Sequence, residues 1–316
     1  MASPLIVSLR KHKNFCGSKI KILSPAKINL YLNIRGKYPG GFCRLESIVE
    51  RISLCDEISI IVKSPSAINI SSNNKNLETS ENLAFKAAYL LKRRLKIPFG
   101  FDIFLKKNIP IGSGLGGGSS NAASTLLGLN ELLNLELGKQ ELYSLGAKLG
   151  SDVNFFLSQS QFAFLEGRGE KITPFKVKNK FHHFIIWPGI AVSTKKVYAA
   201  LKVNLAGSTP FANKKSKLSN GAKLTKFFNN DKILRYALKK GDIFLIKKNI
   251  YNTLEKKAFA LSGKLRKAKT FLKRQGVSAK LTGSGSAFFT VSDNFSLREI
   301  KNLVPGKWSV FEVKTF

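Results

Sequence analysis

The residues best suited to chemistry form a glycine-rich run, Ile111-Gly112-Ser113-Gly114-Leu115-Gly116-Gly117-Gly118-Ser119-Ser120. Glycine occupies five of the seven positions from 112 to 118. It allows the backbone to adopt positive φ angles and to approach a ligand closely. Free N–H groups ahead of a helix form an anion site, which the helix dipole reinforces. A simple turn explains one Gly-Gly pair but not this run, so the sequence predicts a phosphate-binding loop.

Two common phosphate loops fit the surrounding sequence poorly. Gly112, Gly114 and Gly117 satisfy the dinucleotide pattern G-x-G-x-x-G, which also requires an acidic residue after a second strand about 20 residues further on. Residues 134–138 are a poor strand candidate for that role. A Walker loop requires Gly-Lys-Ser/Thr, and no lysine stands between Gly118 and Ser119. The loop is therefore of a different kind.

A carboxylate and a lysine elsewhere in the chain suit phosphoryl transfer, which needs charge neutralisation and a base or positioning group at the attacking hydroxyl. Asp152 precedes Phe155 and Phe156, which would dry its surroundings and tune its pKa. Lys27 and Asn29 stand two apart in a predicted strand and so share a face. Taken singly, Asp152 would fit a helix N-cap and Lys27 would fit a solvent-facing strand position.

Several segments together resemble the GHMP kinases, the superfamily that includes galactokinase, homoserine kinase and mevalonate kinase. Pro110 to Ala123 resembles their ATP loop. More narrowly, the chain is similar to the members that phosphorylate 4-diphosphocytidyl-2-C-methyl-D-erythritol in the non-mevalonate isoprenoid pathway. The match covers nearly all of the chain after Ile20. The other matching segments are Ser24–Leu30, Gly150–Phe156, Gly167–Glu170, Pro188–Ile190 with Thr194, and Leu281–Ser286.

This resemblance implies a reaction and a fold. The reaction is the ATP-dependent phosphorylation of the 2-hydroxyl of that cytidyl substrate, with Mg²⁺ beside ATP. The fold is the two-domain α+β GHMP kinase fold, with a ribosomal S5 domain 2-like N-terminal domain and a ferredoxin-like C-terminal domain. We expect a disordered basic tail at 1–18, the ATP-loop domain at 19–170, and the C-terminal domain at 171–316 with a lysine-rich loop around 204–230.

The resemblance also implies roles for individual residues. Asp152 is the catalytic base, and Lys27 orients Asp152 or the transferred phosphate. Asn29 and Thr194 contact the substrate. Mg²⁺ touches Ser120, although the sequence offers no carboxylate pair dedicated to it. The residues expected at ATP are Asn82, Lys107, Pro110, Ile111, Gly112, Ser113, Gly114, Leu115, Gly116, Gly117, Gly118, Ser119 and Ser120.

Two aromatic side chains are expected at the cytosine base, with Phe42 stacked on it and Tyr198 facing Phe42 across it. The chain departs from the family pattern at Cys43, which replaces the histidine that helps to read the cytosine edge. A thiol is a poor hydrogen-bonding substitute, so backbone groups would do more of the reading. Asn154 replaces a usual proline. These departures keep open a second interpretation, a GHMP kinase for another small alcohol such as mevalonate or homoserine.

The charge of the chain suggests a third interpretation from another class. The formal net charge is +34, with no Asp or Glu before Glu46 and none between Lys171 and Asn230. Such a field attracts nucleotides, nucleic acid and acidic lipid. However, the sequence lacks zinc-finger spacing, an aromatic RNA-binding signature and a basic heptad array. A nucleic-acid-binding protein on a kinase scaffold is therefore the weaker alternative, and nucleic acid is not an expected partner.

Cysteines and histidines give no sign of a disulfide framework or a metal site. The three cysteines form no C-x-x-C pair, which favours a reducing, cytoplasmic location. His182 and His183 are neighbours in an apolar stretch and would point to opposite faces of a strand, so we expect structural roles. No apolar run approaches the roughly 18 residues that cross a bilayer. We expect a monomer or weak dimer without a membrane partner, and organelle targeting by the N-terminal tail stays open.

The elements that must position these residues alternate between strands and helices, as in a mixed α/β protein. Helical spacing covers 82–95, the segment from an N-cap at Ser119 or Ser120 to Leu133, and much of 231–275. The stretch 204–230 is rich in Lys, Ser, Asn and Gly and predicts a loop-rich insertion. The predicted strands are 27–34, 56–62, 101–105, 277–281 and 287–291.

Overall fold

The computed structural model describes residues 15–201, 230–291 and 296–316. Most of the expected basic tail and nearly all of the lysine-rich loop around 204–230 lie outside the described residues. The part of the tail inside them, residues 15–18, makes a turn in which the Gly17 N–H donates to the carbonyl of Val62. That turn leads directly into the first strand.

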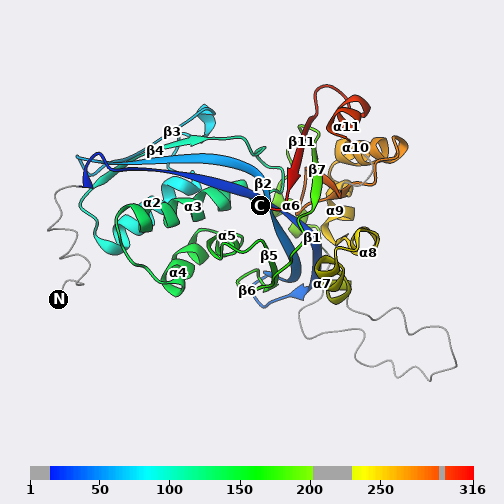
Figure 1. The fold of residues 1–316 in the computed structure, drawn as a ribbon, viewed down its shortest axis with the longest axis horizontal. Coiled ribbons are helices and arrows are strands. Elements are labelled where there is room, and N and C mark those ends of the chain that lie inside the picture. The colour runs from blue at the N-terminus through cyan, green and yellow to red at the C-terminus, as the bar shows by residue number, and fades with distance from the viewer. Residues whose placement is uncertain (1–14, 202–229, 292–295) are drawn as a thin grey trace, which may run out of the picture.

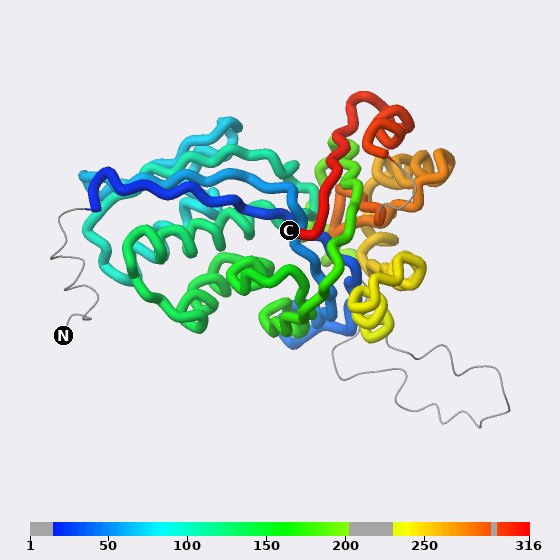
Figure 2. Tube along the Cα trace, in the orientation of Figure 1, coloured from blue at the N-terminus to red at the C-terminus, as the bar shows by residue number. Residues whose placement is uncertain are grey.

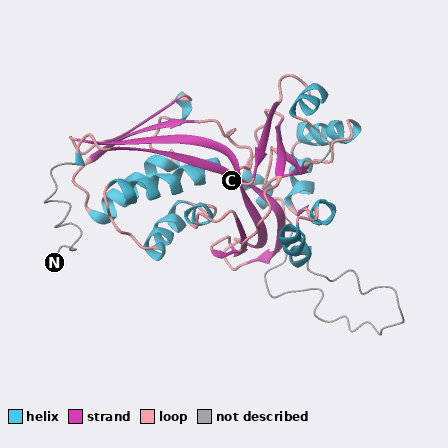
Figure 3. Ribbon diagram, in the orientation of Figure 1, coloured by secondary structure: helices cyan, strands magenta, loops and turns pink. Residues whose placement is uncertain are grey.

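The described residues form two sheets (Figures 1 and 3). The first has seven strands in the order β3-β4-β2-β1-β8, with β5 also paired to β2 and β6 to β5. The second is an antiparallel sheet in the order β11-β7-β10-β9. The strands are β1 (Lys19–Lys37), β2 (Cys43–Lys63), β3 (Ile68–Ser72), β4 (Gly100–Lys106), β5 (Phe162–Gly167), β6 (Lys171–Pro174), β7 (His182–Trp187), β8 (Tyr251–Asn252), β9 (Lys280–Leu281), β10 (Phe288–Val291) and β11 (Ser309–Lys314).

The antiparallel pair β1 and β2 is the long axis of the first sheet. One end of β2 pairs with β4 and the other with β5. The two strands also join the halves of the chain, because β8 adds to β1 at Tyr31 and Leu32 and β11 reaches β2 through the Ile52–Thr315 bridge. Figure 2 shows the C-terminal end of the chain beside these long strands. Lys27, a catalytic candidate, and Asn29, an expected substrate contact, therefore lie where both halves meet.

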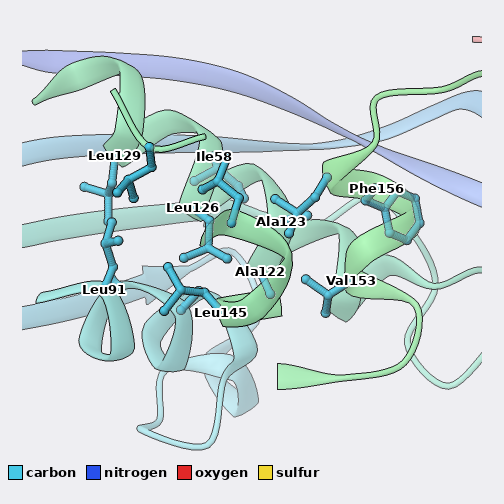
Figure 4. Close-up of a cluster of buried hydrophobic side chains, with 14 of the residues drawn as sticks. Ile58, Leu91, Ala122, Ala123, Leu126, Leu129, Leu145, Val153 and Phe156 are labelled. Carbon is cyan, nitrogen blue, oxygen red and sulfur yellow. The ribbon is translucent and has the colours of Figure 1, made fainter. Parts of the chain in front are cut away.

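Helices cover one face of the first sheet (Figure 1). Among them, α3 is buried along most of its length, which its small residues Ala122 and Ala123 permit. Figure 4 shows its side chains beside Ile58 of β2 and Leu91 of α2, with Phe156 of α5 at one end of the same buried cluster. Burial of this apolar cluster is the main force that holds α3 against the sheet. The helices on this side are α2 (Leu83–Leu95), α3 (Gly117–Leu132), α4 (Lys139–Leu149) and α5 (Val153–Leu157), with a short 3₁₀ helix η2 (Lys75–Leu77).

The remaining helices pack around the second sheet (Figure 1). Apolar residues of the helices at 194–199, 254–261, 263–274 and 297–303 join Phe184, Ile186 and Phe288 in one buried cluster. Those of the helices at 230–240 and 243–249 join another cluster with Ile28 and Phe289. The arrangement is α+β, as the sequence predicted, while the division at residues 170 and 171 stays a prediction. These helices are α6 (Thr194–Ala199), α7 (Asn230–Lys240), α8 (Ile243–Asn249), α9 (Leu254–Leu261), α10 (Gly263–Arg274) and α11 (Leu297–Leu303).

Two expected boundaries were wrong. The N-cap of α3 is Gly116, not Ser119 or Ser120, and the Ser120 N–H already donates to the Gly116 carbonyl within the helix. Gly116 has φ +73°, a left-handed conformation that glycine adopts without strain, so the helix begins inside the glycine run. The strand expected at 277–281 is limited to Lys280–Leu281, because only this short part pairs with β10.

Gly100, where β4 begins, provides a test of the fold. A Cβ atom there would lie 2.1 Å from the carbonyl oxygen of Ala67 and 2.4 Å from that of Pro65. Backbone atoms cannot move aside as a side-chain tip does, so Gly100→Ala should destabilise the protein by about 1–3 kcal/mol, measured by urea denaturation. Gly263→Ala, at an open position of α10, is the control and should not destabilise. Equal stability of both variants would contradict the packing at β4.

Candidate active site

The glycine loop lines a cavity of about 460 Å³ with its residues 110–119. Gly112, Gly114 and Gly116 have φ angles of +67°, +82° and +73°. These left-handed conformations turn the loop so that it ends at the N-terminus of α3, where backbone N–H groups are free. The positive end of the helix dipole adds to them, which suits an anionic ligand such as a phosphate.

A second glycine turn, residues 282–286, packs against the glycine loop. The Ala287 N–H donates to the Ser113 carbonyl at 2.9 Å. A Cβ atom on Gly114 would lie 2.5 Å from the Thr282 carbonyl oxygen, so only glycine allows this approach. The second turn, which belongs to the C-terminal half of the chain, thereby sets the position of the ATP-loop candidate.

Lys27 and Asp152 form an ion pair at the cavity, with Lys27 Nζ 3.5 Å from Asp152 Oδ2. The Lys27 side chain is 6% exposed and that of Asp152 is 40% exposed. Asp152 stands at the N-cap position of α5, yet its side chain makes no capping hydrogen bond. Its carboxylate is therefore available to a ligand in the cavity rather than committed to the helix.

Hydrogen bonds fix the orientation of Lys27. Its backbone N–H donates to the Leu115 carbonyl of the glycine loop, and its Nζ donates to Asn29 Oδ1. Asn29 is held in turn by bonds from its Nδ2 to Ser47 Oγ at 2.9 Å and from its N–H to Thr282 Oγ1 at 3.0 Å. The ammonium group is thus placed between the glycine loop and Asp152 before any ligand binds.

A buried polar network lies beneath the glycine loop, centred on Asp56. This fully buried carboxylate accepts hydrogen bonds from the N–H groups of Asn108 and Ile109, from Asn121 Nδ2 and from Lys107 Nζ. Asn121 also donates to Ser24, whose hydroxyl donates to Ser120 Oγ. The network therefore ties the start of the glycine loop to the first turns of α3.

The Lys107 side chain is buried in this network. Its side chain is only 9% exposed, and burial lowers its pKa, an effect that the neighbouring Asp56 carboxylate opposes. A Cβ atom on Gly117 would lie 2.7 Å from its Nζ, which places the ammonium group directly under the start of α3. Lys107 also lines the cavity, so its charge faces the space next to the glycine loop.

The opposite side of the cavity carries hydroxyl groups. Thr194 Oγ1 and Ser284 Oγ are hydrogen-bonded at 2.7 Å, and both residues line the cavity with Tyr198. Burial raises the pKa of the Tyr198 hydroxyl, and the negative charge of Asp152 raises it further. Tyr198 therefore stays a neutral hydrogen-bonding group close to Asp152.

Most of the predicted site residues line this single cavity. Phe42 and Cys43 are not part of its lining. Phe42 is 54% exposed, and the Arg168 guanidinium carbon lies 3.7 Å from its ring centre. Cys43 is half-buried, and burial raises the pKa of its thiol. The predicted residues that do line the cavity are Lys27, Asn29, Asn82, Lys107, Pro110, Ile111, Gly112, Ser113, Gly114, Leu115, Gly116, Gly117, Gly118, Ser119, Asp152, Thr194 and Tyr198.

Ser120, the expected magnesium contact, does not line the cavity. Ser120 is fully buried and its hydroxyl accepts a bond from Ser24, whereas its neighbour Ser119 lines the cavity. Within residues 15–201, 230–291 and 296–316, no group of three or more His, Cys, Asp or Glu side chains could hold a metal ion. Glu81 and Asp152 do line the cavity. One or two carboxylates suffice for Mg²⁺ when phosphates and water complete its shell, so this donor set fits the ion.

Sequence reasoning missed Asp56, Ser47 and Ser284. Asp56 was included in a predicted strand, but nothing in the neighbouring sequence indicated that its carboxylate would accept hydrogen bonds from a loop and a helix. His183, expected to be structural, has a buried partner: its Nε2 lies 3.1 Å from both carboxylate oxygens of Glu50. Among the helices that the structure describes, none is long and apolar enough to cross a membrane.

The Asp56–Lys107 pair generates a stability prediction. Lys107→Met leaves a buried carboxylate without its counter-charge, so it should destabilise the fold by about 3–5 kcal/mol in urea denaturation. The control is Lys106→Met, whose partner Glu57 is half exposed, and it should cause little change. Adding Asp56→Asn to Lys107→Met should recover part of the loss. A Lys107 variant as stable as the Lys106 variant would contradict the role of the network.

Comparisons with known proteins agree with this geometry. The N-terminal domain of GHMP kinases matches residues 82–160, and the C-terminal domain of that family matches residues 234–308. A crystal structure of 4-(cytidine 5'-diphospho)-2C-methyl-D-erythritol kinase superposes with a TM-score of 0.71 at 28% sequence identity, covering 93% of this chain and 98% of that one.

Curated relatives carry the same name. The 4-diphosphocytidyl-2-C-methyl-D-erythritol kinase of Prochlorococcus marinus is 43% identical over 59% of this chain, and the alignment spans only 60% of the relative's length. The enzyme of that name from Bacillus cytotoxicus is 36% identical over 86% of this chain and 87% of its own length. The expected two-domain fold is confirmed, and this chain belongs to the GHMP kinases, in the branch of the 4-diphosphocytidyl-2-C-methyl-D-erythritol kinases.

Proposed function

We propose that this protein transfers the γ-phosphoryl group of ATP to the 2-hydroxyl of 4-diphosphocytidyl-2-C-methyl-D-erythritol. The observation that carries the proposal is the Lys27–Asp152 pair, which lies in one cavity with the glycine loop. A phosphoryl transfer between two bound molecules needs an anion site next to a base and a cation. The cavity brings these three features together.

ATP would bind with its phosphates along the backbone of residues 112–119. The N–H groups at the start of α3 would bind the phosphate oxygens, and Lys107 would add positive charge from below. The apolar side chains of Leu77, Leu83 and Ile111 line the same cavity and would accept the base. Asn82 is the N-cap of α2 and donates from Nδ2 to the Leu77 carbonyl, so it would keep this wall in place.

Asp152 would accept the proton of the substrate's 2-hydroxyl while the oxygen of that hydroxyl forms a bond to the γ-phosphorus. The bond from that phosphorus to the β,γ-bridging oxygen breaks, and ADP leaves with the electron pair. Lys27, held by Asn29, would stabilise the charge on the transferred group and keep the Asp152 carboxylate oriented. Mg²⁺ would neutralise phosphate charge, with Asp152, Glu81 or Ser119 as the nearby oxygen donors.

The acceptor would occupy the side of the cavity lined by Tyr198, Thr194 and Ser284. The names of the relatives supply the identity of the acceptor, and Tyr198 in the cavity wall would contact its cytosine base, while Phe42 lies outside the lining. Arg168 covers one face of Phe42, so it would have to move or share that ring with the base. The same relatives do not favour mevalonate or homoserine, and a nucleic-acid-binding function would leave the Lys27–Asp152 pair without a role.

Asp152→Asn tests the proposed base. Because general-base catalysis contributes about 10²–10⁴-fold, kcat should fall by that factor while the KM for ATP changes little. Asp102→Asn is the matched control: Asp102 also pairs with a lysine, but on the exposed surface, and its loss should leave kcat unchanged. Steady-state ADP release with both substrates measures the effect. A near-normal kcat for Asp152→Asn would remove Asp152 from the mechanism.

A further inference from the structure

A second cavity, of about 400 Å³, lies apart from the glycine loop, between β1, β2, α3 and the C-terminal end of the chain. Its wall mixes apolar side chains with polar ones and comes from elements of the first sheet and its helices. Figure 1 shows the C-terminus next to β1 and β2 at this place. Residues that matter for its chemistry are Arg51, Ser124, Leu127, Glu131, Phe156 and Phe316.

Arg51 is a buried cation in the wall of this second cavity. Its relative exposure is 9%, and it forms no ion pair with a side-chain carboxylate among the described residues. Its Nε and Nη1 atoms are shielded from solvent and lack a hydrogen-bond acceptor there. The ring of Phe316, 4.7 Å from the guanidinium carbon, is the aromatic neighbour on which the group rests.

The neighbouring acidic groups do not compensate Arg51. Glu50 precedes it in β2 and points to the other face of the strand, where it pairs with His183 and accepts a bond from Thr315. Glu131 lines the second cavity, but it is exposed, and no ion pair joins it to Arg51 in the described structure. The cavity thus places a buried guanidinium without an ion-pair partner beside apolar side chains such as Leu127 and Phe156.

Such an arrangement is unfavourable without a partner. An arginine stays charged in proteins, and burial of an uncompensated charge opposes folding. Burial lowers the pKa of Arg51 from its ordinary value, which reflects the same penalty. An oxyanion in the cavity would compensate the charge of Arg51, because a guanidinium pairs readily with carboxylate and phosphate groups.

We propose that the second cavity is a binding site for a small amphipathic anion, whose phosphate or carboxylate headgroup sits on Arg51. Its apolar body lies against Leu127, Phe156 and the ring of Phe316. The hydroxyl of Ser124 on α3 offers a further donor to the headgroup. A volume of about 400 Å³ is within the range of pockets that bind small molecules.

The second cavity touches the elements that carry the catalytic candidates. Phe156, on α5, lines it and lies at one end of the buried cluster in Figure 4. The edge of its ring would be 3.1 Å from a Cβ atom on Gly116, in the same place where the Lys27 side chain makes contact. A ligand in the second cavity would therefore contact Phe156, which packs beside Gly116 and the Lys27 side chain.

The test uses hexyl phosphate and hexanoate as probes, with hexanol as the uncharged control. Calorimetric titration and thermal unfolding of the full chain should show binding of either anion and no binding of hexanol. Arg51→Met should weaken binding at least about 10-fold, since it removes a hydrogen bond to a charged group. The exposed Arg266→Met on α10 should bind like the unmodified protein. The two anions distinguish a phosphate from a carboxylate site.

Two outcomes would overturn the proposal. One is a failure of the binding test: the unmodified protein binds neither anion, or it binds them no more tightly than Arg51→Met does. Circular dichroism must show that the variant has a normal fold. The other concerns Glu131: if it is the true partner of Arg51, Glu131→Gln should lower the unfolding temperature and Arg51→Met should cancel that loss. The proposed site predicts instead that Glu131→Gln strengthens or preserves anion binding, and that Arg51→Met alone unfolds at the same temperature or higher.

Discussion

The buried carboxylate of Asp56 is the interaction on which the rest of the site depends. It receives donors from the segment that enters the glycine loop, from α3 and from Lys107. Burial of such a charge is tolerated only when its acceptor sites are filled, so the strand end, the loop and the helix must stay in register. This constraint holds the N–H groups of the glycine loop in place.

The catalytic candidates use the frame that this network provides. Lys27 is bonded to the glycine loop through its backbone and to Asn29 through its side chain. Asn29 is held by Thr282, which lies in the second glycine turn. Both halves of the chain therefore contribute to the position of one ammonium group, and the ion pair with Asp152 places the proposed base beside it. Preorganisation of this kind lowers the cost of orienting charges during the reaction.

Sequence patterns predicted much of this arrangement. The glycine run, the strand with Lys27 and Asn29, and the segment with Asp152 were recognised because their local order is characteristic of one family. The cap of α3 was not, since serine is a common N-cap and only the actual φ angle shows that Gly116 takes the position. Asp56, Arg51 and Glu50 were also missed, because their roles arise from contacts with residues far away in the chain.

The central claim is phosphoryl transfer at the Lys27–Asp152 pair to the cytidyl alcohol. The most direct measurement incubates the purified chain with ATP, Mg²⁺ and 4-diphosphocytidyl-2-C-methyl-D-erythritol and follows the products by phosphorus NMR, with mevalonate and homoserine in parallel. The account predicts one new phosphomonoester signal on the cytidyl substrate for each ADP released, and none on the control alcohols. A phosphomonoester only on mevalonate or homoserine, or no transfer to any of the three, would contradict it.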